Sequence, residues 1–273
     1  MPGGYNHGML PADVSDISFP KPIADKLHAY YKRYYLDTLG LPDWEDRIMR
    51  RRREEHFFAK PIMAFMERSL GIPLDGKRVL VVGCGTGGEC VYLASRGAGV
   101  IGLDLSSEAV GILRDKASFL DAKTIQPLTG RAEELPFPND RFDLVVCYTV
   151  LEHVRSLEQA TQELVRVAKP GGKIFIECPN YLYPVEQHYK MNWVPWIPGF
   201  FRKAYLRLHG RPPAFLDTLN WVTSTSLRNL FRNLPVAASQ VFSPLPAEQP
   251  FLFRLFHSRL GLEKNLYFIL GKL

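Results

Sequence analysis

Apolar residues in the first 70 positions recur with the spacing of a helix. One helix is predicted over 22–40, where Ile23 and Leu27 begin a run of apolar residues at intervals of three and four. A second is predicted over 44–70, with a break or kink at Pro61, because a proline inside a helix removes a hydrogen bond. The two helices predict an N-terminal helical cap over residues 1–70.

From residue 77 onward, short and continuously apolar runs alternate with helical stretches. Such alternation is typical of a parallel sheet with both faces covered. The pattern therefore predicts an α/β fold, with residues 71–273 as the main domain. Strands are predicted at 78–83, 99–104, 123–129, 142–147, 173–179, 236–243 and 265–271, and helices at 88–97, 107–117, 157–168 and from Thr225.

The most informative stretch is VLVVGCGTGGEC (79–90), in which Gly83, Gly85, Gly87 and Gly88 follow a buried strand and precede a helix. Glycines let the backbone turn tightly and let a ligand approach it, and the helix N-terminus offers unpaired N–H groups. Positions 83, 85 and 88 also fit the dinucleotide-binding pattern. The loop alone therefore leaves open a dinucleotide or another adenosine-type cofactor.

Asp104 ends the next strand, 21 residues after Gly83. This is the usual place for a carboxylate that accepts hydrogen bonds from ribose hydroxyls. The alternative role for Asp104 is an N-cap of the helix that begins near Ser107. The order of strand, glycine loop, helix, strand and acidic residue predicts a nucleoside cofactor.

Two further stretches, RAEELPFPNDRFDLVVCYTVLEHV (131–154) and VRVAKPGG (165–172), follow in order. With them the chain resembles the class I S-adenosylmethionine-dependent methyltransferases, in the subgroup that contains the ubiquinone/menaquinone-biosynthesis methyltransferases. The resemblance covers residues 75–180 most closely and 220–273 more weakly. It implies a Rossmann-like, doubly wound, mostly parallel sheet of seven strands. It also implies S-adenosylmethionine as cofactor and S-adenosylhomocysteine as product, whereas a dehydrogenase is not expected to carry this series of motifs.

The resemblance implies roles for individual residues. The glycine loop would line the methionine and ribose parts of the cofactor, Asp104 would bind the ribose hydroxyls, and Leu105 would pack on the adenine. The chain departs from the family at Val81 and Arg131, where acidic residues are frequent, which leaves open a non-catalytic domain that binds the cofactor or a partner. The implied cofactor-binding residues are Gly83, Cys84, Gly85, Thr86, Gly87, Asp104, Leu105, Ala132, Glu133 and Tyr148.

The same resemblance bears on metal binding. Related quinone O-methyltransferases carry an acidic residue three positions before a Glu-His pair, and these three residues can hold a metal. Here Thr149 occupies the first of these positions, ahead of Glu152 and His153. The sequence therefore predicts no metal site.

Methyl transfer to oxygen is helped by a general base, most often a histidine or a carboxylate. One candidate is His153, which could instead have a capping or structural role at the start of a helix. The other is the pair Glu186 and His188, which follows the fifth strand on the side of the sheet where ligands of open α/β folds bind. The pair is predicted either as base and substrate contact or as polar residues that stabilise a loop. With the aromatic segment after it, this element resembles some bacterial methyltransferases associated with surface glycans and lipids.

Charge is distributed unevenly along the chain. Residues 181–273 hold 11 Lys and Arg against four Asp and Glu, and 17 of the 33 aromatic residues, whereas the first 180 residues are nearly neutral. The segments 181–222 and 244–264 concentrate this character and are predicted as insertions that cap the substrate. The alternative is a surface that meets lipid head groups, and nucleic acid is the least favoured partner because the basic residues form no continuous track. The run Arg50–Arg53 is predicted as a solvated helix face or, alternatively, an anion-binding patch.

Composition limits the compartment. The chain contains no apolar run near the roughly 18 residues that a spanning helix needs, no secretory signal, and four cysteines without CxxC pairing. These features predict a cytoplasmic protein that can contact a membrane peripherally. The predicted function is methyl transfer from S-adenosylmethionine to an oxygen of a small-molecule, glycan or lipid-linked acceptor. A quinone or polyprenyl C- or O-methyltransferase is the alternative within enzymes.

Overall fold

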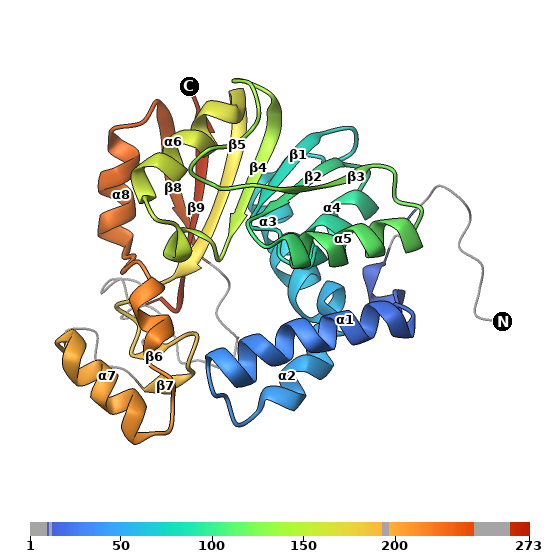
Figure 1. Ribbon diagram of the computed structural model, residues 1–273. Helices are drawn as coiled ribbons and strands as arrows, with labels where there is room; N and C mark the ends of the chain where they lie inside the picture. Colours follow the sequence, from blue (N-terminus) through green and yellow to red (C-terminus); the bar gives the residue numbers. More distant parts are fainter. Residues whose placement is uncertain (1–9, 11–12, 193–196, 243–262) are drawn as a thin grey trace, which may run out of the picture.

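Seven strands form one sheet in the computed structural model, which describes residues 10, 13–192, 197–242 and 263–273 (Figure 1). The strands are β1 (Arg78–Val82), β2 (Gly99–Asp104), β3 (Ile125–Thr129), β4 (Phe142–Tyr148), β5 (Ala168–Pro179), β8 (Val236–Val241) and β9 (Asn265–Lys272). Their order across the sheet is β3-β2-β1-β4-β5-β9-β8. Neighbours among β1 to β5 are parallel, and β9 runs antiparallel to both β5 and β8. The predicted seven-stranded, mostly parallel sheet is confirmed.

Helices cover both faces of the sheet, as the continuously apolar strands predicted. They are α3 (Lys60–Leu70), α4 (Gly88–Ser95), α5 (Ser107–Phe119), α6 (Leu157–Val167) and α8 (Ser224–Arg232). In β9, the ring of Tyr267 lies 5.0 Å from Phe65 of α3, whereas the ring of Phe268 lies 5.2 Å from Phe231 of α8. Because successive residues of a strand point to opposite faces, α3 and α8 lie on opposite sides of the sheet.

The N-terminal segment is helical but interrupted. It consists of α1 (Lys21–Lys32), a π-helical turn (Arg33–Thr38), α2 (Trp44–Arg51) and a second π-helical turn (Glu55–Ala59) that leads into α3. The helix predicted over 44–70 is interrupted at Arg52 and Arg53, which was not predicted, and it changes from a π-helical turn to α3 between Ala59 and Lys60, next to the break predicted at Pro61. Pro61 lies in the first turn of α3, directly after the π-helical turn, and both prolines and π-helical turns are common where helices kink.

The segment 181–222, for which the pattern predicted no regular element, contains the short strands β6 (Val185–Glu186) and β7 (Met191–Asn192) and the helix α7 (Gly199–Leu208). It lies at the same end of the sheet as α1 and α2 (Figure 1). The two segments touch, because the guanidinium of Arg211 hydrogen-bonds the carbonyl of Gly40, and the rings of Tyr34 and Phe215 lie 5.9 Å apart. Most of the other predicted insertion, 244–264, lies outside the described residues.

The structure also describes the cysteines and tests for a membrane-spanning helix. All four cysteines are buried free thiols. Within the described ranges, no helix has both the length and the apolar character needed to cross a bilayer.

Candidate active site

The three glycines in the loop after β1 have different surroundings. Gly83, Gly85 and Gly87 all have positive φ values, of 68°, 50° and 91°. A Cβ at Gly83 would overlap Val150, and one at Gly87 would overlap Leu113, so these two positions are glycine because of packing. A Cβ at Gly85 would meet no described atom within 4 Å. Gly85 therefore exposes backbone to open space, which a ligand can occupy.

Asp104 holds this loop from the sheet. Its Oδ2 accepts the N–H of Gly85 at 2.8 Å, and its Oδ1 accepts the N–H of Ser106 at 2.8 Å. The N-cap of α5 is Ser106, whose hydroxyl accepts the N–H of Ala109 at 3.2 Å. The capping alternative for Asp104 is therefore wrong, and its carboxylate orients the glycine loop.

A cavity of about 290 Å³ opens beside Asp104 at the carboxyl ends of β1, β2 and β4. Leu105 lies on its wall with 63% of its surface exposed, and a flat apolar ring could pack against it. Glu133, which also lines the cavity, accepts the N–H of Arg155 at 2.7 Å, and its Oε2 lies 3.9 Å from the Nε of Arg131. Of the predicted cofactor residues, this cavity is lined by Gly83, Asp104, Leu105, Ala132 and Glu133 and is not lined by Cys84, Gly85, Thr86, Gly87 or Tyr148.

Two of the residues away from the cavity have other contacts. The Sγ of Cys84 lies in the core, where a Cβ on Gly102 would approach it to 3.1 Å. The hydroxyl of Thr86 donates to Glu54 at 2.5 Å and lies 2.8 Å from the hydroxyl of Tyr31. Thr86 therefore connects the glycine loop to the N-terminal helices.

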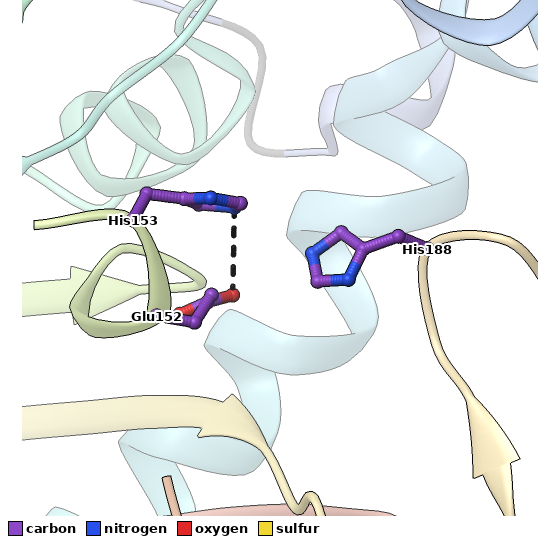
Figure 2. Close-up of side chains that lie close together, drawn as sticks. All are labelled: Glu152, His153 and His188. Atoms are coloured by element: carbon purple, nitrogen blue, oxygen red, sulfur yellow. Dashed lines mark ion pairs between the residues drawn. The ribbon is translucent and has the colours of Figure 1, made fainter. Parts of the chain in front are cut away.

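Three titratable side chains meet next to the cavity (Figure 2). Glu152 and His153 belong to a short 3-10 turn (Leu151–His153) that follows β4, and His188 comes from the 181–222 segment. The rings of His153 and His188 lie 5.3 Å apart, and Glu152 Oε1 is 3.9 Å from His153 Nε2. His153 also lines the cavity. The fold thus brings together the two histidines that the sequence offered as separate candidates.

Glu186 contacts both the ring and the backbone of His188. Its Oε1 lies 2.8 Å from His188 Nδ1, and its Oε2 accepts the backbone N–H groups of His188 and Tyr189 at 2.8 and 2.5 Å. A carboxylate that accepts the Nδ1–H of an imidazole selects the tautomer in which Nε2 of the neutral ring carries the lone pair. Glu186 is 3% exposed, so it orients His188 and stabilises the local turn at the same time.

Burial shifts the titration of the other two groups. It lowers the pKa of His153 to about 4, with a contribution from His188, and it raises the pKa of Glu152 to about 7. Neither carboxylate oxygen of Glu152 has a hydrogen-bond partner in the described part of the chain. At neutral pH, His153 is therefore an uncharged imidazole beside the cavity.

The cluster also bears on the metal prediction. The ligand atoms of Glu152, His153 and His188 all lie within 4.8 Å of one another, so these three side chains could hold a metal ion. The sequence predicted no metal because Thr149 lacks a ligand, but the fold supplies a third group from position 188. A motif within one segment could not reveal this.

Two residues that the sequence analysis did not single out fasten the insertion to this site. The ring of Phe215 lies 5.7 Å from His153 and 5.2 Å from His188. The side-chain amide of Asn220 donates to the carbonyls of Leu151 and Val154, and its backbone N–H donates to the carbonyl of Glu152. The aromatic richness of 181–222 was the one signal for such a covering role.

Comparison with known proteins agrees with this geometry. Residues 80–176 match the family described as methyltransferase domain. The chain is 36% identical over 128 residues to a ubiquinone biosynthesis O-methyltransferase of Azoarcus sp. (strain BH72), a match that covers 45% of this chain and 55% of that protein. It is 36% identical over 140 residues to an uncharacterized methyltransferase of Synechocystis sp., covering 48% of this chain and 60% of the other. The chain thus spans about half the length of the curated relatives it matches.

Solved structures share the fold. The YcgJ protein of Bacillus subtilis superposes with a TM-score of 0.56 at 18% identity, covering 78% of this chain and 98% of that one. An S-adenosylmethionine-dependent methyltransferase of Mesorhizobium loti gives a TM-score of 0.55 at 19% identity, with 76% and 96% covered. At these identities the likeness concerns the fold alone. The sequence match, the ordered motifs and this fold together place residues 80–176 in the class I S-adenosylmethionine-dependent methyltransferase family.

Proposed function

We propose that the chain is an S-adenosylmethionine-dependent methyltransferase that methylates an oxygen of a small-molecule acceptor bound beneath residues 181–222. One observation carries the proposal. The same cavity is lined by Gly83 of the glycine loop, by Asp104 at the end of β2 and by His153. A wall suited to a nucleoside and the imidazole next to His188 therefore share one space at the carboxyl edge of the sheet, where open α/β folds bind ligands.

The residues around the loop fit this cofactor. Gly85 leaves its backbone uncovered, the N-terminus of α4 follows directly, and Asp104 and Leu105 offer a carboxylate and an apolar surface to a nucleoside. When bound, S-adenosylmethionine supplies a methyl group already activated by its positive sulfur. The protein then has to align the acceptor and exclude water.

His188 is proposed as the general base. Its Nε2 would take the proton of the acceptor hydroxyl while the oxygen bonds to the methyl group and the carbon–sulfur bond breaks, giving a methyl ether and S-adenosylhomocysteine. Glu186 would hold the imidazole in the required tautomer and stabilise its charged form. The neutral His153 beside it would orient the acceptor.

The names of the relatives support oxygen as the methylated atom, because several are ubiquinone biosynthesis O-methyltransferases. They also favour a second candidate acceptor, a quinone or polyprenyl compound. The family match ends at residue 176, before Glu186 and His188. The match thus does not reach the segment that would contact the acceptor. A glycan or lipid-linked acceptor is proposed because the 181–222 segment is rich in aromatic and basic residues.

Exposed apolar residues on α7 support a peripheral membrane contact. Phe200, Phe201 and Leu208 are 66%, 54% and 83% exposed, and Arg207 of the same helix is also exposed. Aromatic and basic side chains together suit the head-group region of a bilayer. Cosedimentation with anionic vesicles tests this, and a Phe200→Ser/Phe201→Ser variant that sediments equally would contradict it.

Titration calorimetry with S-adenosylhomocysteine tests the cofactor, and absence of binding by the wild-type chain would refute the proposed function. Asp104→Ala is expected to weaken binding, while Glu108→Gln, an exposed change on α5, serves as the control. The acceptor can be sought by mass spectrometry of metabolite, glycan and lipid extracts. The expected signal is a compound that gains the mass of one methylene only when protein and cofactor are both present.

A further inference from the structure

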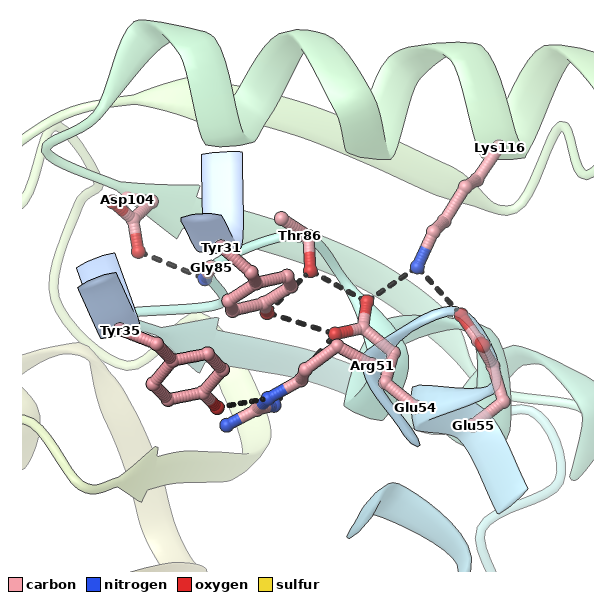
Figure 3. Close-up of polar contacts among 9 residues, drawn as sticks. All are labelled: Tyr31, Tyr35, Arg51, Glu54, Glu55, Gly85, Thr86, Asp104 and Lys116. Atoms are coloured by element: carbon pink, nitrogen blue, oxygen red, sulfur yellow. Dashed lines mark hydrogen bonds and ion pairs between the residues drawn. The ribbon is translucent and has the colours of Figure 1, made fainter. Parts of the chain in front are cut away.

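A buried polar network joins the N-terminal segment to the glycine loop (Figure 3). Glu54, which is 3% exposed, accepts hydrogen bonds from the hydroxyls of Tyr31 at 2.9 Å and Thr86 at 2.5 Å. Lys116, fully buried on α5, donates to Glu54 and, at 2.7 Å, to Glu55. The helix α1, the loop after β1 and the helix α5 thus converge on one carboxylate.

Arg51 completes the network and departs from its neighbours in the run Arg50–Arg53, which are exposed as predicted for a solvated face. Its guanidinium lies 4.8 Å from the ring centroid of Tyr31 and 4.1 Å from that of Phe58, and its Nη1 is 3.7 Å from Glu54 Oε2. Burial alone would raise the pKa of Glu54, but Lys116 and Arg51 lower it. The carboxylate is therefore ionised and accepts a strong hydrogen bond from the Thr86 hydroxyl.

Gly88, the first residue of α4, allows Glu54 to lie close to that helix. A Cβ at Gly88 would come within 3.1 Å of Glu54 Cγ and 3.4 Å of Ala59 Cβ, so a larger residue would push the N-terminal segment away from α4. Gly88 is therefore explained by packing against Glu54. This distinguishes it from Gly85, which faces open space.

We infer that Glu54 is a positioning residue for the cofactor loop. Figure 3 shows Gly85 held by Asp104 from the sheet and the adjacent Thr86 held by Glu54 from the N-terminal segment. A loop already fixed in its binding geometry loses less conformational freedom when the ligand binds, so affinity rises. The inference rests on the proposed function, because it concerns the same cofactor loop.

Glu54→Gln and Glu55→Gln are a matched pair. Each replaces a buried carboxyl group of the same cluster by an amide and weakens one contact with Lys116, but of the two, Glu54 is the residue that hydrogen-bonds Thr86. Calorimetry with S-adenosylhomocysteine, on full chains shown to be folded, is expected to give about tenfold weaker binding for Glu54→Gln. Glu55→Gln is expected to bind within about twofold of the wild type, although its stability also falls.

Variants of the hydroxyl partners keep the inference testable if Glu54→Gln does not fold. Tyr31→Phe retains the ring under Arg51 and loses the hydroxyl, so it is expected to fold and to bind less tightly. Thr86→Ser should bind as the wild type does, and Thr86→Val should weaken binding as much as Glu54→Gln. The double variant of Glu54 and Thr86 should be no worse than either single variant, because both lose the same contact.

The outcomes separate the two claims. Unchanged affinity in Glu54→Gln, or in both Tyr31→Phe and Thr86→Val, would overturn the positioning role. Equal losses in Glu54→Gln and Glu55→Gln would also overturn it, since the cluster would then act through stability alone. Absence of binding by the wild type would overturn the proposed function itself.

Discussion

The imidazole rings of His153 and His188 lie 5.3 Å apart, although one follows β4 and the other belongs to the segment that covers the sheet edge. Phe215 contacts both rings and keeps the covering segment against the turn that carries His153. The cavity beside Asp104 and the proposed base His188 are therefore held together by contacts between distant parts of the chain.

Replacing His188 by Ala should lower kcat at least roughly tenfold, because it removes the proposed general base. The affinity for S-adenosylhomocysteine should not change, since His188 does not line the cavity beside Asp104. Glu186→Gln, which keeps the imidazole and replaces its carboxyl partner by an amide, should give a smaller decrease. An unchanged kcat in His188→Ala would leave the pair with the loop-stabilising role.

Gly85→Ala and Gly87→Ala should separate binding from stability. Both residues have positive φ, but an added Cβ overlaps Leu113 at position 87 and meets no described atom at position 85. Gly85→Ala should therefore cost roughly 1–2 kcal/mol of unfolding free energy and weaken cofactor binding. Gly87→Ala should cost more stability, as measured by urea unfolding, and equal costs in the two variants would contradict this account of the loop.

Glu152 should make stability depend on pH. Burial raises its pKa in the folded chain to about 7, from a usual value of 4.5. Because the folded state holds the proton more tightly, this contribution to stability is complete below about pH 4.5 and is lost as the pH rises through about 7. Between about pH 5 and pH 8, the unfolding free energy of Glu152→Gln should fall less than that of the wild type. Identical pH profiles, measured by denaturant unfolding with a chelator present, would argue against the buried acid.

Chelation tests the prediction that no metal is required. Dialysis against EDTA should leave methyl transfer within about twofold of the untreated rate, because an activated sulfonium needs no Lewis acid. A loss of activity that divalent cations restore would refute the prediction. Glu152, His153 and His188 would then be the ligands to test by substitution.

The sheet could be predicted from the sequence because its signal is local. A strand such as β1 is buried on both faces, so its apolar run appears directly in the chain. Gly83 directly follows this strand, and Asp104 is the last residue of the next one. The same local reasoning missed the interruption at Arg52 and Arg53, which is accompanied by contacts of Glu54 with Thr86 and Lys116. Those contacts are tertiary.

The site could be predicted only in parts. The sequence offered His153 and the pair Glu186 and His188 as separate candidates, and nothing in their spacing indicated that the two imidazoles meet. Thr86 was assigned to the cofactor from its place in the loop, whereas its hydroxyl binds a carboxylate from the N-terminal segment. Such pairings depend on how distant segments pack, which a single sequence does not encode locally.

The hydrogen bond from Arg211 to the carbonyl of Gly40 joins residues 171 positions apart. A ribosome must therefore deliver more than two thirds of the chain before the helices at its start can make this contact. The sheet strands β1 to β5 leave the ribosome earlier and can begin to pair, so the covering layer is completed after the scaffold beneath it. A nascent chain stalled before Arg211 would consequently expose its glycine loop without the full cover, in a form that chaperones and proteases could distinguish from the finished protein.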